Sequence, residues 1–153
     1  MRDASKSILS VDIEVPNQTR FLALIGNIAE QIGQDLAVSA GDHDTLAYNL
    51  NLVLTEAAAN AIQYASPSDP GSTIRISIEL EDKDLVVRVY DHGHGFDLEA
   101  VPEPDFADLS ERGRGIFFIR TLMDSVNYHK AEGGNVLEMR KMLIGDVPEK
   151  RLS

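Results

Sequence analysis

Apolar and polar positions along the chain recur with two different periods, and these periods predict its helices and strands. Apolar residues return about every 3.6 positions in three segments, which predicts helices over residues 19–36, 46–62 and 113–123. Gly26 is a weak point of the first of these helices, because glycine is a poor helix former. Five shorter segments alternate apolar with polar residues, which predicts strands over residues 8–15, 73–81, 85–90, 125–129 and 135–142.

Turn residues between the alternating segments indicate how the strands are connected. An Asp-Lys pair at 82–83 and a Gly-Gly pair at 133–134 each separate two predicted strands, so two antiparallel hairpins are expected. The first strand ends at Pro16, which places it at the edge of a sheet. Residues 97–112 are acidic, contain two prolines and have no clear period. This segment is therefore expected to form a long, mobile surface loop of the kind that often serves as a lid.

Length and composition are those of one globular domain. Of the 153 residues, 43% are hydrophobic and 25% are charged, a balance that favours independent folding. The domain is expected over residues 8–143, between a flexible N-terminus (1–7) and a flexible tail (144–153). No segment has the length and apolar character of a membrane span or of a secretory leader, which predicts a cytoplasmic protein without a membrane partner. The chain contains no cysteine, which excludes disulfides, thiolate metal sites and cysteine nucleophiles.

The charge balance restricts the possible ligands. A formal net charge of -11 opposes direct binding to nucleic acid, because non-specific binding to phosphate backbones depends on clustered Lys and Arg. The same charge repels a free nucleotide. A nucleotide site in this chain would therefore need local positive potential from backbone amides, a bound cation or a few arginines.

The second predicted helix carries the first candidate residues, Glu56 and Asn60. They are four positions apart and share one face of the helix, which Tyr64 continues. A carboxylate there can accept a proton, and an amide oxygen can ligate a hard cation without adding charge. Taken alone, however, the pair is better explained as an ordinary polar stripe that faces solvent.

The segment after the strand over 85–90 holds Asp91, Gly93, Gly95 and Phe96. Strand alternation places the side chain of Asp91 on the face of the apolar residues, where a carboxylate needs a hydrogen-bond donor. The amino group of adenine is such a donor, and glycines allow the backbone to pass close to a flat ligand. The alternative is a glycine turn with an exposed aspartate. The segment is not a dinucleotide-binding fingerprint, because no crossover helix follows it directly.

The third predicted helix opens with five residues, Arg112, Gly113, Arg114, Gly115 and Ile116. Unsatisfied backbone amides and the positive end of the helix dipole make such a start a natural phosphate site. The two arginines either bind phosphate or pair with the acidic residues beside them. His92 and His94 are better explained as solvated loop histidines than as zinc ligands, since no other histidine is close to them in the sequence.

The three groups of residues together resemble a known superfamily. Their order and arrangement are similar to those of the GHKL ATPases and kinases, and the sequence most closely resembles the anti-sigma factor serine/threonine kinases of bacterial partner-switching systems. The similarity covers about residues 9–142. It implies an α+β two-layer sandwich, the Bergerat or histidine-kinase-like ATPase fold, with helices on one face of a mixed, largely antiparallel sheet. The residues that carry it are Glu56-x-x-x-Asn60-Ala61, Asp91-x-Gly93-x-Gly95-Phe96 and Gly113-x-Gly115-Ile116.

The resemblance also implies a role for each candidate residue. Glu56 would be the general base that activates a partner's serine or threonine hydroxyl, Asn60 would ligate Mg²⁺ between the phosphates of ATP, and Asp91 would recognise adenine. The other nucleotide-binding positions would be Tyr64, Gly93, Gly95, Phe96, Arg112, Gly113, Arg114, Gly115, Ile116 and Asn135, with Gly113 and Gly115 at the phosphates. Two of them depart from the family pattern: Tyr64 stands where many relatives have histidine, and Asn135 stands where threonine is common.

The implied function is a kinase that binds and inhibits a sigma factor, phosphorylates a STAS-type anti-sigma factor antagonist, and forms a homodimer. A non-catalytic module, in which ATP orders the lid and shifts the affinity for a partner, stays open as an alternative. The catalytic half of a histidine kinase is less favoured, because no helix pair with a phosphoacceptor histidine precedes the domain.

Overall fold

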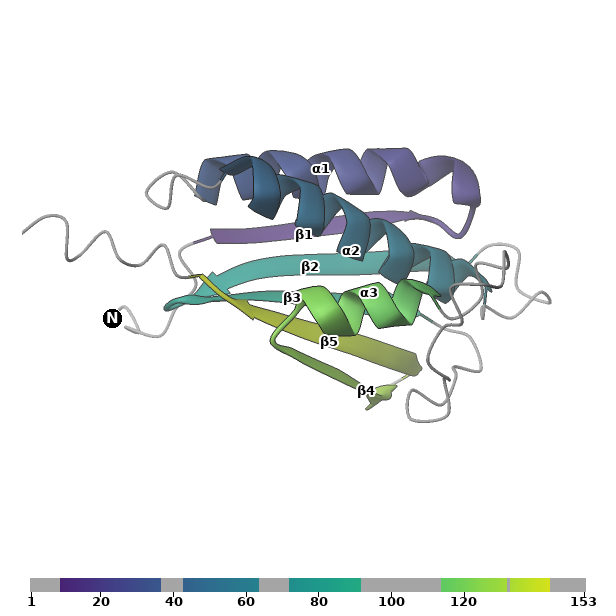
Figure 1. Ribbon diagram of the computed structural model, residues 1–153. Coiled ribbons are helices and arrows are strands. Elements are labelled where there is room, and N and C mark those ends of the chain that lie inside the picture. The colour runs from purple at the N-terminus through teal and green to yellow at the C-terminus, as the bar shows by residue number, and fades with distance from the viewer. Residues whose placement is uncertain (1–8, 37–42, 64–71, 92–113, 132, 144–153) are drawn as a thin grey trace, which may run out of the picture.

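The computed structural model describes residues 9–36, 43–63, 72–91, 114–131 and 133–143, which form a five-stranded sheet with helices on one of its faces (Figure 1). None of the helices in these segments has the length and apolar character that a membrane span requires. The strands are β1 (Leu9–Pro16), β2 (Thr73–Glu81), β3 (Asp84–Asp91), β4 (Ser125–Ala131) and β5 (Gly134–Met142). The helices are the short 3-10 helix η1 (Thr19–Phe21), α1 (Leu22–Leu36), α2 (His43–Gln63) and α3 (Arg114–Leu122).

The sheet has the strand order β1-β2-β3-β5-β4, and each neighbouring pair is antiparallel. Both predicted hairpins are confirmed, and β1 lies at an edge as Pro16 indicated. Asp82 has a φ of 56° in the first hairpin turn and Gly133 a φ of 81° in the second, the left-handed conformations that tight hairpin turns use. Because β5 lies between β3 and β4, the two hairpins meet along β3 and β5. That pairing brings the end of β3 together with the start of β5.

The hydrophobic core lies between the sheet and the helices. Each strand turns alternate residues toward the helices, as a half-buried sheet requires. In α1 the buried positions recur at helical spacing over Ile25, Ala29 and Ile32. The largest fully buried side chains of this core are Ile25, Val53, Leu54, Ile74, Ile76, Ile78, Leu85, Val89, Ile119 and Met139.

Two glycines let α1 pack closely on α2. Gly26 does not interrupt α1, and a Cβ added to it would stand 2.5 Å from Asn51 Oδ1 on α2. At Gly33 a Cβ would stand 2.7 Å from the Cα of Ala47. A glycine that looked like a weak point in the sequence is therefore a site of close helix contact. Beside it, Asn51 Nδ2 donates a hydrogen bond of 2.8 Å to Glu30 Oε1, which ties α2 to α1.

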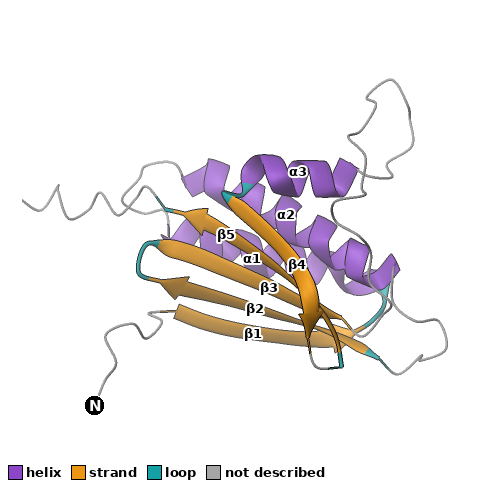
Figure 2. Ribbon diagram, turned by 90° about the horizontal axis from the view of Figure 1, so that it is seen from below, coloured by secondary structure: helices purple, strands orange, loops and turns teal. Residues whose placement is uncertain are grey.

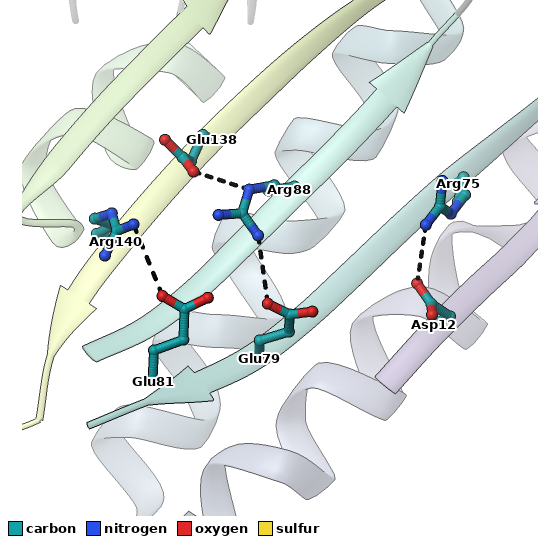
Figure 3. Close-up of polar contacts among 7 residues, drawn as sticks. All are labelled: Asp12, Arg75, Glu79, Glu81, Arg88, Glu138 and Arg140. Carbon is teal, nitrogen blue, oxygen red and sulfur yellow. Dashed lines mark hydrogen bonds and ion pairs between the residues drawn. The ribbon is translucent and has the colours of Figure 1, made fainter. Parts of the chain in front are cut away.

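The other face of the sheet is not covered by any described helix and carries paired charges (Figures 2 and 3). Arg88 Nε donates to Glu138 Oε2 at 2.8 Å, and Arg88 Nη1 lies 3.5 Å from Glu79 Oε1. Burial lowers the pKa of Arg88, but the attraction and hydrogen bond of Glu138, helped by Glu79, outweigh it and raise this pKa above its usual value. Val86, which faces away from the helices and lies between Glu79 and Arg140 in the strand register, is fully buried.

Candidate functional site

The candidate site is built on the second half of α2. Glu56 and Asn60 lie one turn apart and are both half-buried, and Ala57, Ala58 and Ala61 beside them are buried. Helix α2 packs against α3 on one side and against β3 below, so it connects the elements that carry the other candidate residues. The shared face predicted for Glu56 and Asn60 is therefore part of an interface between elements and not an exposed polar stripe.

The carboxamide of Asn60 has an unmet hydrogen-bonding need. Its Nδ2 is buried and has no hydrogen-bond partner, a state that costs on the order of 1–3 kcal/mol. A half-turn of the carboxamide places Oδ1 where Nδ2 stands, because the two atoms differ little in size. After this half-turn Asn60 fits the implied Mg²⁺, because its helix would present an uncharged oxygen donor at the position where Nδ2 has no hydrogen-bond partner.

Asp91 and Asn135 form the second part of the site, at the ends of β3 and β5. The two residues are directly opposite each other in the strand register. Asn135 Nδ2 donates a hydrogen bond of 3.1 Å to Asp91 Oδ1, and the two side chains are 4% and 6% exposed, respectively. One hydrogen-bond donor to the buried carboxylate is therefore an amide from the other hairpin. Asp91 also points to the helix side of the sheet, as the alternation of β3 predicted.

The start of α3 forms the third part of the site. Gly115 is the second residue of the helix, and the next residue, Ile116, is 4% exposed and belongs to the hydrophobic core. Ile116 therefore anchors this end of the helix to the core. A Cβ added to Gly115 would stand 2.6 Å from Glu56 Oε1. The carboxylate of Glu56 therefore lies against the first turn of α3, where the helix dipole favours negative charge.

Several sequence-predicted residues lie outside the described part of the chain. Arg114 is the first residue of α3, but its side chain lies outside that part too. The others are Tyr64, Gly93, Gly95, Phe96, Arg112 and Gly113, together with His92 and His94. Their roles stay predictions.

The structure adds two contacts that the sequence did not indicate. Asp91 and Asn135 are 44 residues apart, and their pairing depends on how the two hairpins meet. Glu56 and Gly115 belong to separate helices, and their contact depends on the packing of α3 on α2. Helical and strand periods describe spacing within one element, so neither contact has a signal in the pattern of a single sequence. Co-variation between the paired positions would be such a signal.

Comparison with known proteins identifies a domain that spans the candidate residues. The sequence profile of the histidine kinase-like ATPase domain matches residues 19–141. A serine-protein kinase RsbW of Halalkalibacterium halodurans is 28% identical over 151 residues, which cover 94% of this chain and 89% of that protein. The serine-protein kinase RsbW of Bacillus subtilis is 26% identical over 144 residues, which cover 89% of this chain and 87% of that protein.

Two further comparisons are consistent with these. An anti-sigma F factor of Anoxybacillus flavithermus is 31% identical over 99 residues, which cover 61% of this chain and 68% of that protein. Among solved structures, the histidine kinase domain from a blue-light activated histidine kinase of Erythrobacter litoralis superposes with a TM-score of 0.50 at 18% identity. The match covers 94% of this chain but 65% of the other one. At this identity the likeness supports the fold alone.

Proposed function

Because the chain belongs to the family of histidine kinase-like ATPase domains, we propose that it is an ATP-dependent serine/threonine protein kinase that acts as an anti-sigma factor. In this role it sequesters a sigma factor and phosphorylates an anti-sigma factor antagonist. The observation that carries the proposal is the likeness to serine-protein kinases over 94% and 89% of the chain. The presence of both Glu56 and Asn60 supports catalysis over a role in binding alone, because a nucleotide-sensitive module has no need of a base.

The proposed reaction transfers the γ-phosphoryl group of ATP to a hydroxyl of the antagonist. Glu56 accepts the proton of the serine or threonine hydroxyl, whose oxygen forms a bond to the γ-phosphorus while the bond from that phosphorus to the β-γ bridging oxygen breaks. ADP leaves with the bridging oxygen. The first-turn amides of α3 would stabilise phosphate charge, as helix starts do. This role of the amides is the source of local positive potential that a chain of charge -11 requires.

Asn60 would hold the Mg²⁺ ion through its amide oxygen, and the ion would supply neutralising charge to the phosphates. The buried Nδ2 of Asn60, which has no hydrogen-bond partner, supports this assignment. Asp91, held by Asn135, would accept a hydrogen bond from the amino group of adenine. The family resemblance adds further residues to the proposed nucleotide site. They are Tyr64, Gly93, Gly95, Phe96, Arg112, Gly113 and Arg114.

The proposed partners are a sigma factor and a STAS-type antagonist, and the proposed assembly is a homodimer in the cytoplasm. The naming of the relatives as anti-sigma factor and serine-protein kinase supports the two partners. Direct contact with nucleic acid is not part of the proposal, because the net charge is -11.

The decisive experiment compares the wild-type chain with Glu56→Gln, which keeps the size of the side chain and removes its basicity. Both proteins are mixed with radiolabelled Mg-ATP and the antagonist encoded beside the gene for this chain. We expect phosphoserine or phosphothreonine on the antagonist with wild type, and a transfer rate reduced by about 10²-fold or more with Glu56→Gln, since general base catalysis contributes about that much. ATP affinity should stay within about threefold, because binding does not need the base.

Two results would contradict the proposal. If the wild-type chain binds Mg-ATP but leaves the antagonist unmodified, the kinase reaction is wrong. If Glu56→Gln cells show the full regulatory response, phosphoryl transfer is not required and the chain acts as a nucleotide-sensitive binding module.

A further inference from the structure

Gly115 and Glu56 occupy the same small volume between α3 and α2. A Cβ at position 115 would stand 2.6 Å from Oε1, 3.3 Å from Cβ and 3.4 Å from Cδ of Glu56. Non-bonded carbon contacts are most favourable near 3.5 Å, so a methyl group there would push the carboxylate away by roughly 1 Å. The atom that must move is the end of a flexible side chain. The protein can therefore fold around the change, but the carboxylate cannot stay where it is.

Backbone conformation does not explain why position 115 is glycine. Gly133 is a useful contrast: it has a φ of 81°, and a Cβ added to it would have no neighbour within 4 Å. Gly133 is thus needed for its conformation. Gly115 lies inside α3 without a positive φ, where alanine is the better helix former. The space taken by Glu56 is the reason that remains in the described structure.

We propose that Gly115 is a positioning residue for Glu56. Because glycine has no side chain, the carboxylate of Glu56 can occupy the space beside the first turn of α3. This inference rests on the proposed role of Glu56 as the base. It differs from the role that family resemblance assigns to Gly115, which is close approach of the backbone to phosphate. The two roles predict different kinetic defects for the same substitution.

The first test separates rate from affinity in Gly115→Ala. A base displaced by about 1 Å should lower the rate of transfer from saturating Mg-ATP by about tenfold to 10²-fold, because transfer depends on that geometry. The dissociation constant of Mg-ATP should change by less than about threefold. An unchanged rate, or a dissociation constant that rises tenfold or more, would overturn the proposal and favour the phosphate role.

The second test is a double-mutant cycle with Glu56→Ala, measured as thermal unfolding without nucleotide. Removing the carboxylate removes the collision. Gly115→Ala should then raise Tm by about 2 °C more in the Glu56→Ala background than in wild type, because only the gain in helix propensity is left. Equal Tm changes in the two backgrounds would mean that position 115 does not act on Glu56.

A third variant tests rescue. Glu56→Asp withdraws the carboxylate by one methylene group, so Gly115→Ala should reduce the transfer rate by a smaller factor in this background than in wild type. If Gly115→Ala reduces the transfer rate by the same factor in the Glu56→Asp background as in wild type, the proposal is wrong. The unfolding cycle needs neither ATP nor antagonist, so it tests the contact even where the kinase assay fails. A wild-type chain without transfer activity thus refutes the proposed function, and an additive unfolding cycle refutes this inference.

Discussion

Asp91 and Asn135 are the residues at which the proposed recognition of adenine is open to a direct chemical test. Asn135 is buried and donates to Asp91 Oδ1, so it fixes the orientation of the carboxylate. Asn135→Ala should weaken ATP binding by about tenfold, because a hydrogen bond to a charged group is lost. The same substitution should barely affect purine riboside triphosphate, which lacks the amino group that Asp91 is proposed to bind. Competition binding with the two nucleotides measures both effects.

Asn135→Thr is the matched variant for that experiment, since it keeps a hydroxyl donor at the position. It should retain more of the preference for ATP than Asn135→Ala does. An equal loss of affinity for both nucleotides would show that Asn135 supports the fold of the site and not the recognition of the amino group.

At the scale of elements, the close packing of α1 on α2 depends on Gly33. A Cβ there would stand 2.7 Å from the Cα and 3.0 Å from the N of Ala47, which are backbone atoms and cannot rotate away. We expect Gly33→Ala to lower the free energy of unfolding by about 1–3 kcal/mol despite the better helix propensity of alanine. Urea denaturation with an unchanged m-value would measure this loss.

Two other α1 variants calibrate the effect of Gly33→Ala. In Gly26→Ala the new methyl group would collide with the side-chain ends of Asn51 and Thr55, which can move if their hydrogen bonds are given up. The loss of unfolding free energy should therefore be smaller than for Gly33→Ala. Asn27→Ala, at an exposed position of the same helix, should leave stability unchanged or slightly raised. If Gly33→Ala behaves like Asn27→Ala, the helices do not pack as closely as described.

On the uncovered face of the sheet, Arg88 and Glu138 should stabilise the fold through a pairwise coupling. With Nε and Oε2 at 2.8 Å and both side chains about one-fifth exposed, a double-mutant cycle should give about 1 kcal/mol, reduced by salt. The pKa of Arg88 is raised by its acidic partners, so its contribution is complete below the unfolded pKa and is lost only as pH rises through the folded one. That window lies above ordinary assay conditions.

The coupling should therefore be constant from about pH 7 to pH 9, the range in which arginine is fully charged and carboxylates are ionised. Chemical denaturation of wild type, Arg88→Met, Glu138→Gln and the double variant at both pH values would measure it. A coupling energy that falls between pH 7 and pH 9 would contradict the attribution of this coupling to the ion pair of Arg88 and Glu138.

The sequence predicts elements better than it predicts contacts between them. The period of α1 and the alternation of β3 follow from which residues are buried, so their positions were predictable. The role of Gly26 in the contact between α1 and α2 was not predictable, because helix propensity does not take a neighbouring helix into account. The pairing of Asp91 with Asn135 likewise arises from the order β3-β5-β4, which brings two separate hairpins together. Long-range contacts of this kind depend on tertiary packing, which a local period does not describe.

At the scale of the whole molecule, the charge of -11 predicts that the proposed nucleotide binding depends on the cation. The protein repels the phosphates at long range, and Asn60 is proposed to hold the ion that neutralises them. ATP with Mg²⁺ should therefore bind more tightly than ATP with a chelator. Asn60→Ala should remove most of that difference, whereas a loss of ATP affinity that is equal with and without Mg²⁺ would argue against Asn60 as the ligand.

Because ligand binding is coupled to folding, the roles proposed for Glu56, Asn60 and Asp91 can be tested through the stability of the whole domain. Mg-ATP at 100 times its dissociation constant should add about 2.7 kcal/mol to the free energy of unfolding, a rise in Tm of about 5–10 °C for a domain of this size. Glu56→Gln should retain this rise, since the base is proposed to act only in transfer. Asn60→Ala and Asp91→Asn should lose most of it, since each is proposed to bind one end of the nucleotide. A thermal shift that Glu56→Gln abolishes would place Glu56 in nucleotide binding and remove the reason to treat it as the base.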